Sequence, residues 1–175
     1  MICESEKCTG CFACYNACPK QCIEMKEDKF GYIKPQIDKK KCIQCNICKK
    51  VCPSNNIVKS ERPKEAYAAC NRDCESRIDS ASGGVAEVFS EYVINNDGVV
   101  YGCIMDEKID VYHKEVDTIQ DLVKFKGSKY VQSYIGDSYK KIKKQLLENK
   151  YVLFIGTPCQ VAGLKNYLNR DYENL

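Results

Sequence analysis

The sequence predicts a small α+β domain at the N-terminus, followed by an α/β domain with a mostly parallel sheet. Two observations lead to this expectation. Most of the 14 cysteines fall within residues 1–60, around short apolar segments. In residues 61–175, short apolar runs alternate with stretches of helical periodicity. The boundary between these two sequence patterns falls at a polar, proline-containing segment, residues 59–64. We interpret this segment as the linker between the two domains.

Eight of the cysteines form two runs with the pattern C-x2-C-x2-C-x3-C-P. The first run ends at Pro19 and consists of Cys8, Cys11, Cys14 and Cys18. The second run ends at Pro53 and consists of Cys42, Cys45, Cys48 and Cys52. Every member of the first run recurs 34 residues later, so the two runs are an internal duplication.

This spacing suits iron–sulfur chemistry. Three closely spaced thiolates can wrap one side of a [4Fe-4S] cage, and the fourth must approach from elsewhere. In the bacterial two-cluster arrangement, the fourth cysteine of each run ligates the other cluster. We therefore predict a two-cluster ferredoxin-type domain that transfers electrons. Cluster 1 is expected on Cys8, Cys11, Cys14 and Cys52. Cluster 2 is expected on Cys18, Cys42, Cys45 and Cys48.

Two other uses of cysteine fit the pattern less well. Structural zinc takes two pairs of ligands instead of a triplet followed by x3-C-P. Disulfides need an oxidising compartment, and the first residues carry no signal-peptide apolar core. Cys3 and Cys22 break the pattern and are interpreted as small packing residues, with a redox role the less favoured alternative.

The bulk composition limits the possible partners. The net charge of +3 is too small to suggest nucleic acid, and lysines near the cysteine runs can balance anionic clusters or meet an acidic redox partner. No apolar stretch approaches the ~20 residues that span a bilayer. A cytoplasmic location is expected.

The remaining pattern predicts the secondary structure. A short hairpin is expected from residues 23–25 and 30–35. In the second domain, strands are expected at 66–69, 99–104, 111–113 and 151–155. Helices are expected from 85 to about 95, from a Thr118–Asp121 capping box to 125, at 138–149, and after Gly156. The first of these helices is expected to have one buried side, formed by residues at helical spacing: Val85, Val88, Phe89, Tyr92 and Val93.

Three loops are candidates for binding a cofactor. Residues 80–84, Ser-Ala-Ser-Gly-Gly, open a helix whose N-terminus can bind an anion, although an ordinary cap explains them equally. Residues 126–133 offer cations and hydroxyls on a glycine loop, or simply a polar surface. Residues 156–160, Gly-Thr-Pro-Cys-Gln, place Cys159 in the first turn of a helix, either as a reactive thiolate or as a buried packing residue. Cys70, Cys74 and Cys103 are interpreted as packing residues. The alternative is a third metal site formed by these three cysteines and Cys159. His113 is interpreted as structural rather than catalytic.

These loops, together with Gly98-Val99-Val100-Tyr101-Gly102, occur in one order that resembles the beta-subunit family of coenzyme F-420 hydrogenases and dehydrogenases. The resemblance spans essentially the whole chain. It implies FAD in the α/β part, clusters as an electron relay, and a deazaflavin or another organic two-electron acceptor. The flavin-pocket residues that it implies are Ser82, Gly83, Gly84, Gly127, Ser128, Lys129 and Tyr130. Thr157, Pro158 and Cys159 would line the same site or a nearby cluster.

The chain departs from that family in two respects. Lys126 stands where relatives commonly have arginine, which changes how an anion would be held. Relatives also usually continue for a large segment after the last helix, so the chain corresponds to their N-terminal part. Two functions follow: an iron–sulfur flavoprotein oxidoreductase working with a redox partner protein or subunit, or an electron-carrier module without catalysis of its own.

Overall fold

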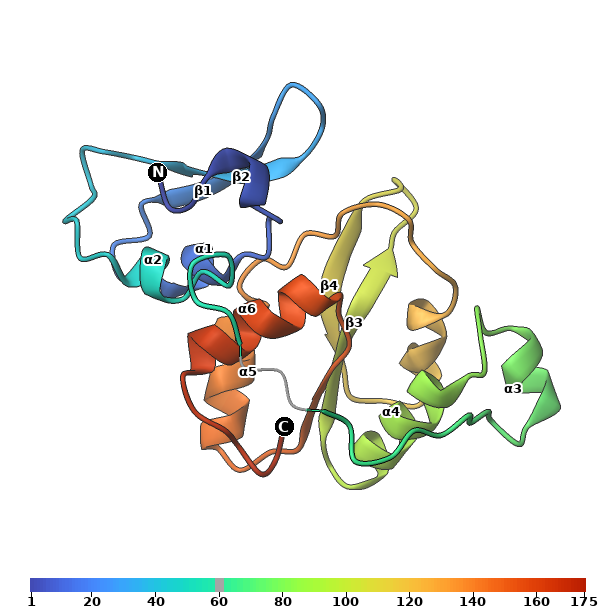
Figure 1. Ribbon diagram of the computed structural model, residues 1–175. Coiled ribbons are helices and arrows are strands. Elements are labelled where there is room, and N and C mark those ends of the chain that lie inside the picture. The colour runs from blue at the N-terminus through green and yellow to red at the C-terminus, as the bar shows by residue number, and fades with distance from the viewer. Residues whose placement is uncertain (59–61) are drawn as a thin grey trace. The chain divides into compact units, whose positions relative to one another are not determined.

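The computed structural model of the chain describes residues 1–58 and 62–175. The predicted boundary between residues 60 and 61, and the first residues of the predicted linker, lie outside the described residues. Short 3-10 helices are η1 (Ser5–Lys7) and η2 (Gln120–Phe125). The strands are β1 (Ile23–Glu27), β2 (Ile33–Ile37), β3 (Val99–Met105), β4 (Val111–Val116) and β5 (Val152–Phe154). The α-helices are α1 (Ala13–Ala17), α2 (Ile47–Lys50), α3 (Cys74–Ile78), α4 (Val85–Asn95), α5 (Ser138–Leu147) and α6 (Pro158–Leu168) (Figure 1).

The described residues form two compact units, and neither is continuous in sequence. Unit 1 contains residues 1–58, 135–143 and 156–172. Unit 2 contains the described part of 59–134, together with 144–155 and 173–175. The cysteine-rich segment therefore shares its unit with helix α6 and the first turns of α5.

In unit 1, β1 and β2 form the predicted hairpin, with Ile23 paired to Ile37 across the two strands. Ile23 and Met25 point to the same side of β1 and are buried, whereas Glu24 between them is exposed. This alternation is the period-two pattern of a strand with one covered face. The prediction of a hairpin between the two cysteine runs is confirmed.

The rest of unit 1 packs around a helical core. Tyr139 and Ile142 of α5 are fully buried, and Leu164 and Leu168 of α6 are almost so. Pro158 occupies the first position of α6, and Thr157 and Gln160 form a reciprocal capping box there. The predicted helix after Gly156 is confirmed, and this double cap fixes where it begins.

Unit 2 contains a three-stranded sheet with the order β4-β3-β5. β3 pairs with β5 in parallel but with β4 antiparallel, so the expected mostly parallel sheet is present only in part. The reason is the connection: five residues separate β3 from β4, too few for a crossover. The strand predicted at 66–69 is wrong, since these residues form no regular structure.

The helix predicted from residue 85 to about 95 is confirmed as α4, but the side of it that is buried differs from the prediction. Phe89 is 59% exposed and Tyr92 is 67% exposed, whereas Ser90 on the opposite side is 2% exposed. The small Ser90 side chain, which donates to the carbonyl oxygen of Ala86 at 2.7 Å, occupies the buried face. Val85 and Val93 of the predicted face are half-buried, so the prediction of a buried face is wrong for Val88, Phe89 and Tyr92.

The remaining elements follow the prediction with smaller differences. β5 is shorter than the expected strand, and only Val152 in it is fully buried. Thr118 donates to the side chain of Asp121 at 3.0 Å instead of capping a backbone N–H, and η2 is a 3-10 helix. In the described ranges, no helix combines the length and apolar character needed to cross a membrane.

Candidate functional site

The backbone repeats the duplication seen in the cysteine runs. Gly10 and Phe12 adopt left-handed conformations within the first run, with φ of 63° and 64°. Their partners 34 residues later, Gln44 and Asn46, do the same, with φ of 56° and 59°. Left-handed residues in such turns help to form backbone concavities lined by N–H groups, which bind anions in many iron–sulfur sites. The two loops therefore share a conformation suited to anionic sulfur.

The cysteines gather around two cavities in unit 1. One cavity is lined by the triplet of the first run together with the last cysteine of the second run: Cys8, Cys11, Cys14 and Cys52. The other is lined by the triplet of the second run together with the last cysteine of the first run: Cys18, Cys42, Cys45 and Cys48. Each cavity thus offers four soft sulfur donors, the ligand set of a [4Fe-4S] cluster.

Each cavity also contains a fifth thiol. Cys3 lines the first cavity, and its side chain contacts Cys52 and Cys8. Cys22 lines the second, with its Sγ 3.4 Å from the Sγ of Cys18. The interpretation of these two residues as mere packing residues missed this proximity, which no sequence spacing reveals.

Burial keeps several of these thiols neutral. Desolvation raises the pKa of Cys11 to about 11, against a smaller lowering by the backbone N–H of Ala13. Burial also raises the pKa of Cys14 well above its usual range. Because the ligands of a cluster are thiolates, loading iron at this cavity must release protons.

Helix α6 is attached to the loop of the first cavity. The phenol oxygen of buried Tyr139 lies 2.8 Å from the carbonyl oxygens of both Cys11 and Gln160. Burial raises the pKa of Tyr139, so the phenol keeps its proton and donates it to one carbonyl at a time. Cys159 at the start of α6 is near enough that its charge contributes to the raised pKa of Cys11. The predicted position of Cys159 near a cluster site is compatible with this arrangement.

Close packing at Gly163 of α6 leads to a first prediction. A Cβ atom at this position would lie 3.1 Å from the Sγ of Cys11 and 3.3 Å from its Cβ. Gly163→Val adds still more atoms there, so we expect a loss of about 1–3 kcal/mol in the free energy of unfolding. Iron should also be lost selectively from the first cavity, because the loop of Cys11 must shift. Chemical denaturation and iron analysis measure the two effects.

The matched control is Lys165→Val, which places the same side chain on the same helix at an exposed position. It should cost only the lower helix propensity of valine, under about 1 kcal/mol, and leave the iron content unchanged. Equal iron loss in the two variants would contradict the packing argument.

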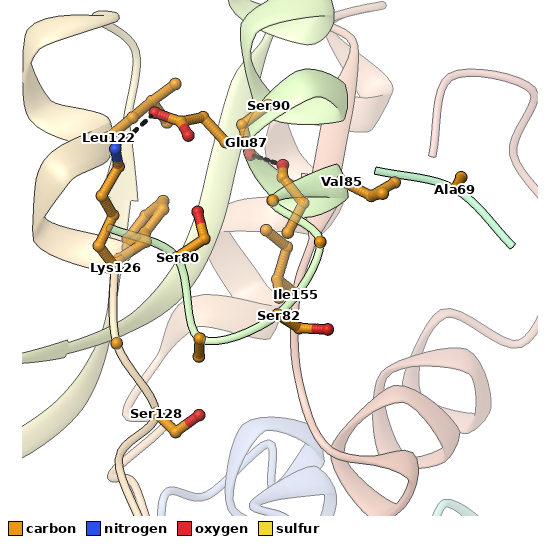
Figure 2. A pocket seen from close by; sticks show the side chains of 16 residues that line it. Ala69, Ser80, Ser82, Val85, Glu87, Ser90, Leu122, Lys126, Ser128 and Ile155 are labelled. Atoms are coloured by element: carbon orange, nitrogen blue, oxygen red, sulfur yellow. Dashed lines mark hydrogen bonds and ion pairs between the residues drawn. The ribbon is translucent and has the colours of Figure 1, made fainter. Parts of the chain in front are cut away.

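Unit 2 contains a separate cavity of about 330 Å³ that joins two of the predicted loops (Figure 2). Its lining includes Ser82, Gly83 and Gly84 from the first loop, and Gly127 and Ser128 from the second. A Cβ on Gly83 would lie 2.8 Å from the carbonyl oxygen of Ala69, so only glycine fits beneath that segment. The volume is at the lower end of the range for small-molecule sites.

One ion pair occupies the wall of this cavity. The Nζ of Lys126 lies 3.1 Å from Oε1 of Glu87, with both side chains largely buried. Figure 2 shows this pair at one end of the cavity and Ser128 at the other. The side chain of Ser76 hydrogen-bonds to Glu87 and lies 3.3 Å from the Nζ of Lys126. An anionic ligand would therefore meet a lysine whose charge already has a partner.

Other residues predicted for a flavin pocket lie elsewhere. The Nζ of Lys129 donates to the carbonyl oxygens of Phe125 and Lys126, at 3.1 and 2.8 Å, and so shapes the second loop. Tyr130 is 95% exposed. Neither lines the cavity, and residues 157–159 belong to unit 1.

The remaining thiols show no metal-binding arrangement. All 14 cysteines are free. Cys70 and Cys74 are exposed, and Arg77 donates to both sulfur atoms, at 3.6 and 3.7 Å. In residues 1–58 and 62–175, no three His, Cys, Asp or Glu side chains approach as they would around a single metal ion. A four-iron cage holds its ligands further apart than one ion does, so this finding does not bear on the two cysteine cavities.

Comparison with known proteins agrees with the cysteine pattern. Residues 7–56 match the family model of the 4Fe-4S dicluster domain, which covers both runs. This segment is therefore a ferredoxin-like iron–sulfur module, and its function is electron transfer. The predictions of iron–sulfur clusters and a redox role are confirmed. No curated protein matches the chain.

Proposed function

We propose that the chain is an iron–sulfur flavoprotein oxidoreductase, or the N-terminal part of one. When bound, the clusters would carry single electrons, and FAD would pair them for an organic two-electron acceptor such as a deazaflavin. The observation that carries this proposal is the cavity of unit 2, where two glycine loops of the F-420-type pattern come together. The ordered resemblance of the loops supports FAD as the ligand.

The chain's residues have distinct roles in this proposal. Cys8, Cys11, Cys14 and Cys52 hold cluster 1, and Cys18, Cys42, Cys45 and Cys48 hold cluster 2. Ser82, Gly83 and Gly84 present the start of the 11-residue helix α4 to the diphosphate of FAD. Gly127 and Ser128 close the other side. Because the charge of Lys126 is already balanced by Glu87, this ion pair would orient FAD more than it would neutralise the charge of its diphosphate.

A redox partner protein would deliver or remove the electrons in unit 1. Support comes from a cavity of about 650 Å³ that borders Cys8 and Cys42, the first cysteine of each run. Lys34, which is paired with Asp28 at 3.4 Å, and Lys39 also line it. The Lys39 charge suits an acidic partner surface.

The test is FAD binding by the anaerobically reconstituted chain, measured by equilibrium dialysis. We expect one FAD per chain and an affinity at least about tenfold weaker for Ser82→Trp, whose indole would fill the cavity. Asn95→Trp is the control, since Asn95 is exposed at the last position of α4, the helix that follows the loop of Ser82, and does not line the cavity. Intact clusters without FAD binding would favour the electron-carrier module.

A further inference from the structure

The two additional cysteines of unit 1 share a specific position. Cys22 lies on the same cavity as Cys18 and Cys42 and interacts with both, and Cys3 lies on the same cavity as Cys52 and Cys8 and interacts with both. In each case the partners are the crossing cysteine of the cavity and the first cysteine of its triplet. Each cavity therefore presents five thiols for four ligand positions.

The duplication does not account for this correspondence. Residues 34 positions from Cys3 and Cys22 are Ile37 and Asn56, neither of which is a ligand for iron. One additional thiol precedes the first run and the other follows it. A requirement for small packing residues explains neither why both are cysteine nor why both lie beside the crossing ligand.

The Cys22 side chain is well placed to exchange with Cys18. Its Sγ lies 3.4 Å from the Sγ of Cys18, and the residue is only 6% exposed and lines the same cavity as the four predicted ligands. Its backbone N–H points to the Cys18 sulfur at 3.4 Å, and its carbonyl oxygen accepts from Asp38 at 2.8 Å. The backbone is thus fixed, and only the short side chain must rotate to exchange one sulfur for the other.

We propose that Cys22 and Cys3 are reserve cluster ligands, which replace Cys18 and Cys52 respectively when a crossing thiolate is lost or blocked. In the exchange, the bond from iron to the Cys18 sulfur breaks and a bond from the same iron to the Cys22 sulfur forms. The proton of the Cys22 thiol passes to the Cys18 thiolate, and no electron is transferred. This inference rests on the proposed cluster ligation and adds a second ligand set to each site.

The test compares the iron and sulfide content of anaerobically reconstituted variants. The wild-type chain should hold about eight irons. Cys18→Ala should keep all of them, because Cys22 takes the vacant position, whereas Cys18→Ala combined with Cys22→Ala should lose iron from the second cavity. Cys45→Ala is the matched control, because the two thiols placed beside Cys22 are Cys18 and Cys42, so Cys22 is not proposed to replace Cys45. It should lose iron whether or not Cys22 is present.

Electron paramagnetic resonance of the reduced protein gives an independent readout. A cluster held through Cys22 should have an altered signal in Cys18→Ala while the first cluster keeps its own. The same comparison with Cys52→Ala, alone and with Cys3→Ala, examines the first cavity. If Cys18→Ala loses as much iron as Cys45→Ala, the reserve-ligand inference is overturned while the proposed ligation stands. A wild-type chain without iron would overturn both.

Discussion

Replacing the first triplet of cysteines by alanine should halve the iron content and release Cys52, but not Cys18. The triple variant Cys8→Ala, Cys11→Ala and Cys14→Ala removes three of the four donors of the first cavity, so about four of eight irons should remain. Cys52 lines that cavity and should become a free thiol. Cys18 lines the other cavity and should stay bound to iron. Alkylation under anaerobic conditions, followed by mass spectrometry, identifies which sulfur is free.

The mirror variant supplies the control. Replacing Cys42, Cys45 and Cys48 should free Cys18 and leave Cys52 bound. Without crossing, each triplet would lose its own fourth cysteine, and the labelling of Cys18 and Cys52 would be reversed in both variants. Because the two variants remove equal numbers of ligands, general destabilisation cannot produce opposite labelling patterns. The crossed ligation is therefore tested separately from the existence of the clusters.

The cysteine pattern predicts the iron–sulfur module because its information is local. Ligand spacing and the 34-residue repeat are visible in the sequence, and the repeat extends to the left-handed backbone at Phe12 and Asn46. Gly163 shows the opposite case. Its closeness to Cys11 depends on a helix far along the chain packing against the first run, and no periodicity reports such a contact.

Helix α4 shows a second limit of sequence reasoning. The spacing of apolar residues predicts that they share one side of the helix, but it does not predict which side packs against the rest of the unit. Here the small Ser90 lies on the buried side, and Phe89 and Tyr92 remain exposed. The fifth thiols Cys3 and Cys22 were invisible for a related reason, since only the folded chain brings them to the crossing ligands. The glycine loops stay a prediction as a ligand site, although Gly83, Gly84 and Gly127 do line one cavity.

The stability of unit 2 should depend on pH through His113, the only histidine of the chain. Burial lowers its pKa from 6.5 to about 4, and the hydrogen bond to Ile155 opposes this shift. The neutral ring donates from Nε2 to the carbonyl oxygen of Ile155 at 3.1 Å and accepts at Nδ1 from Ser133 at 3.1 Å. It also stacks on Phe154, with ring centroids 5.3 Å apart. A proton on Nδ1 would leave a buried charge and break the bond from Ser133.

The direction of this pH dependence follows from how many protons the folded and the unfolded chain bind at His113. The unfolded chain binds a proton at His113 below pH 6.5, whereas the folded chain does so only below about pH 4. The contribution of the neutral ring is complete above pH 6.5 and declines as the pH falls toward 4, by about 3 kcal/mol. His113→Gln cannot titrate, so the difference in unfolding free energy between the two proteins should shrink by that amount across this window. Acid lability of the clusters affects both proteins alike and cancels in the difference. A difference that stayed constant from pH 7 to 4 would show that His113 titrates equally in the folded and unfolded chains, contrary to its burial beside Phe154.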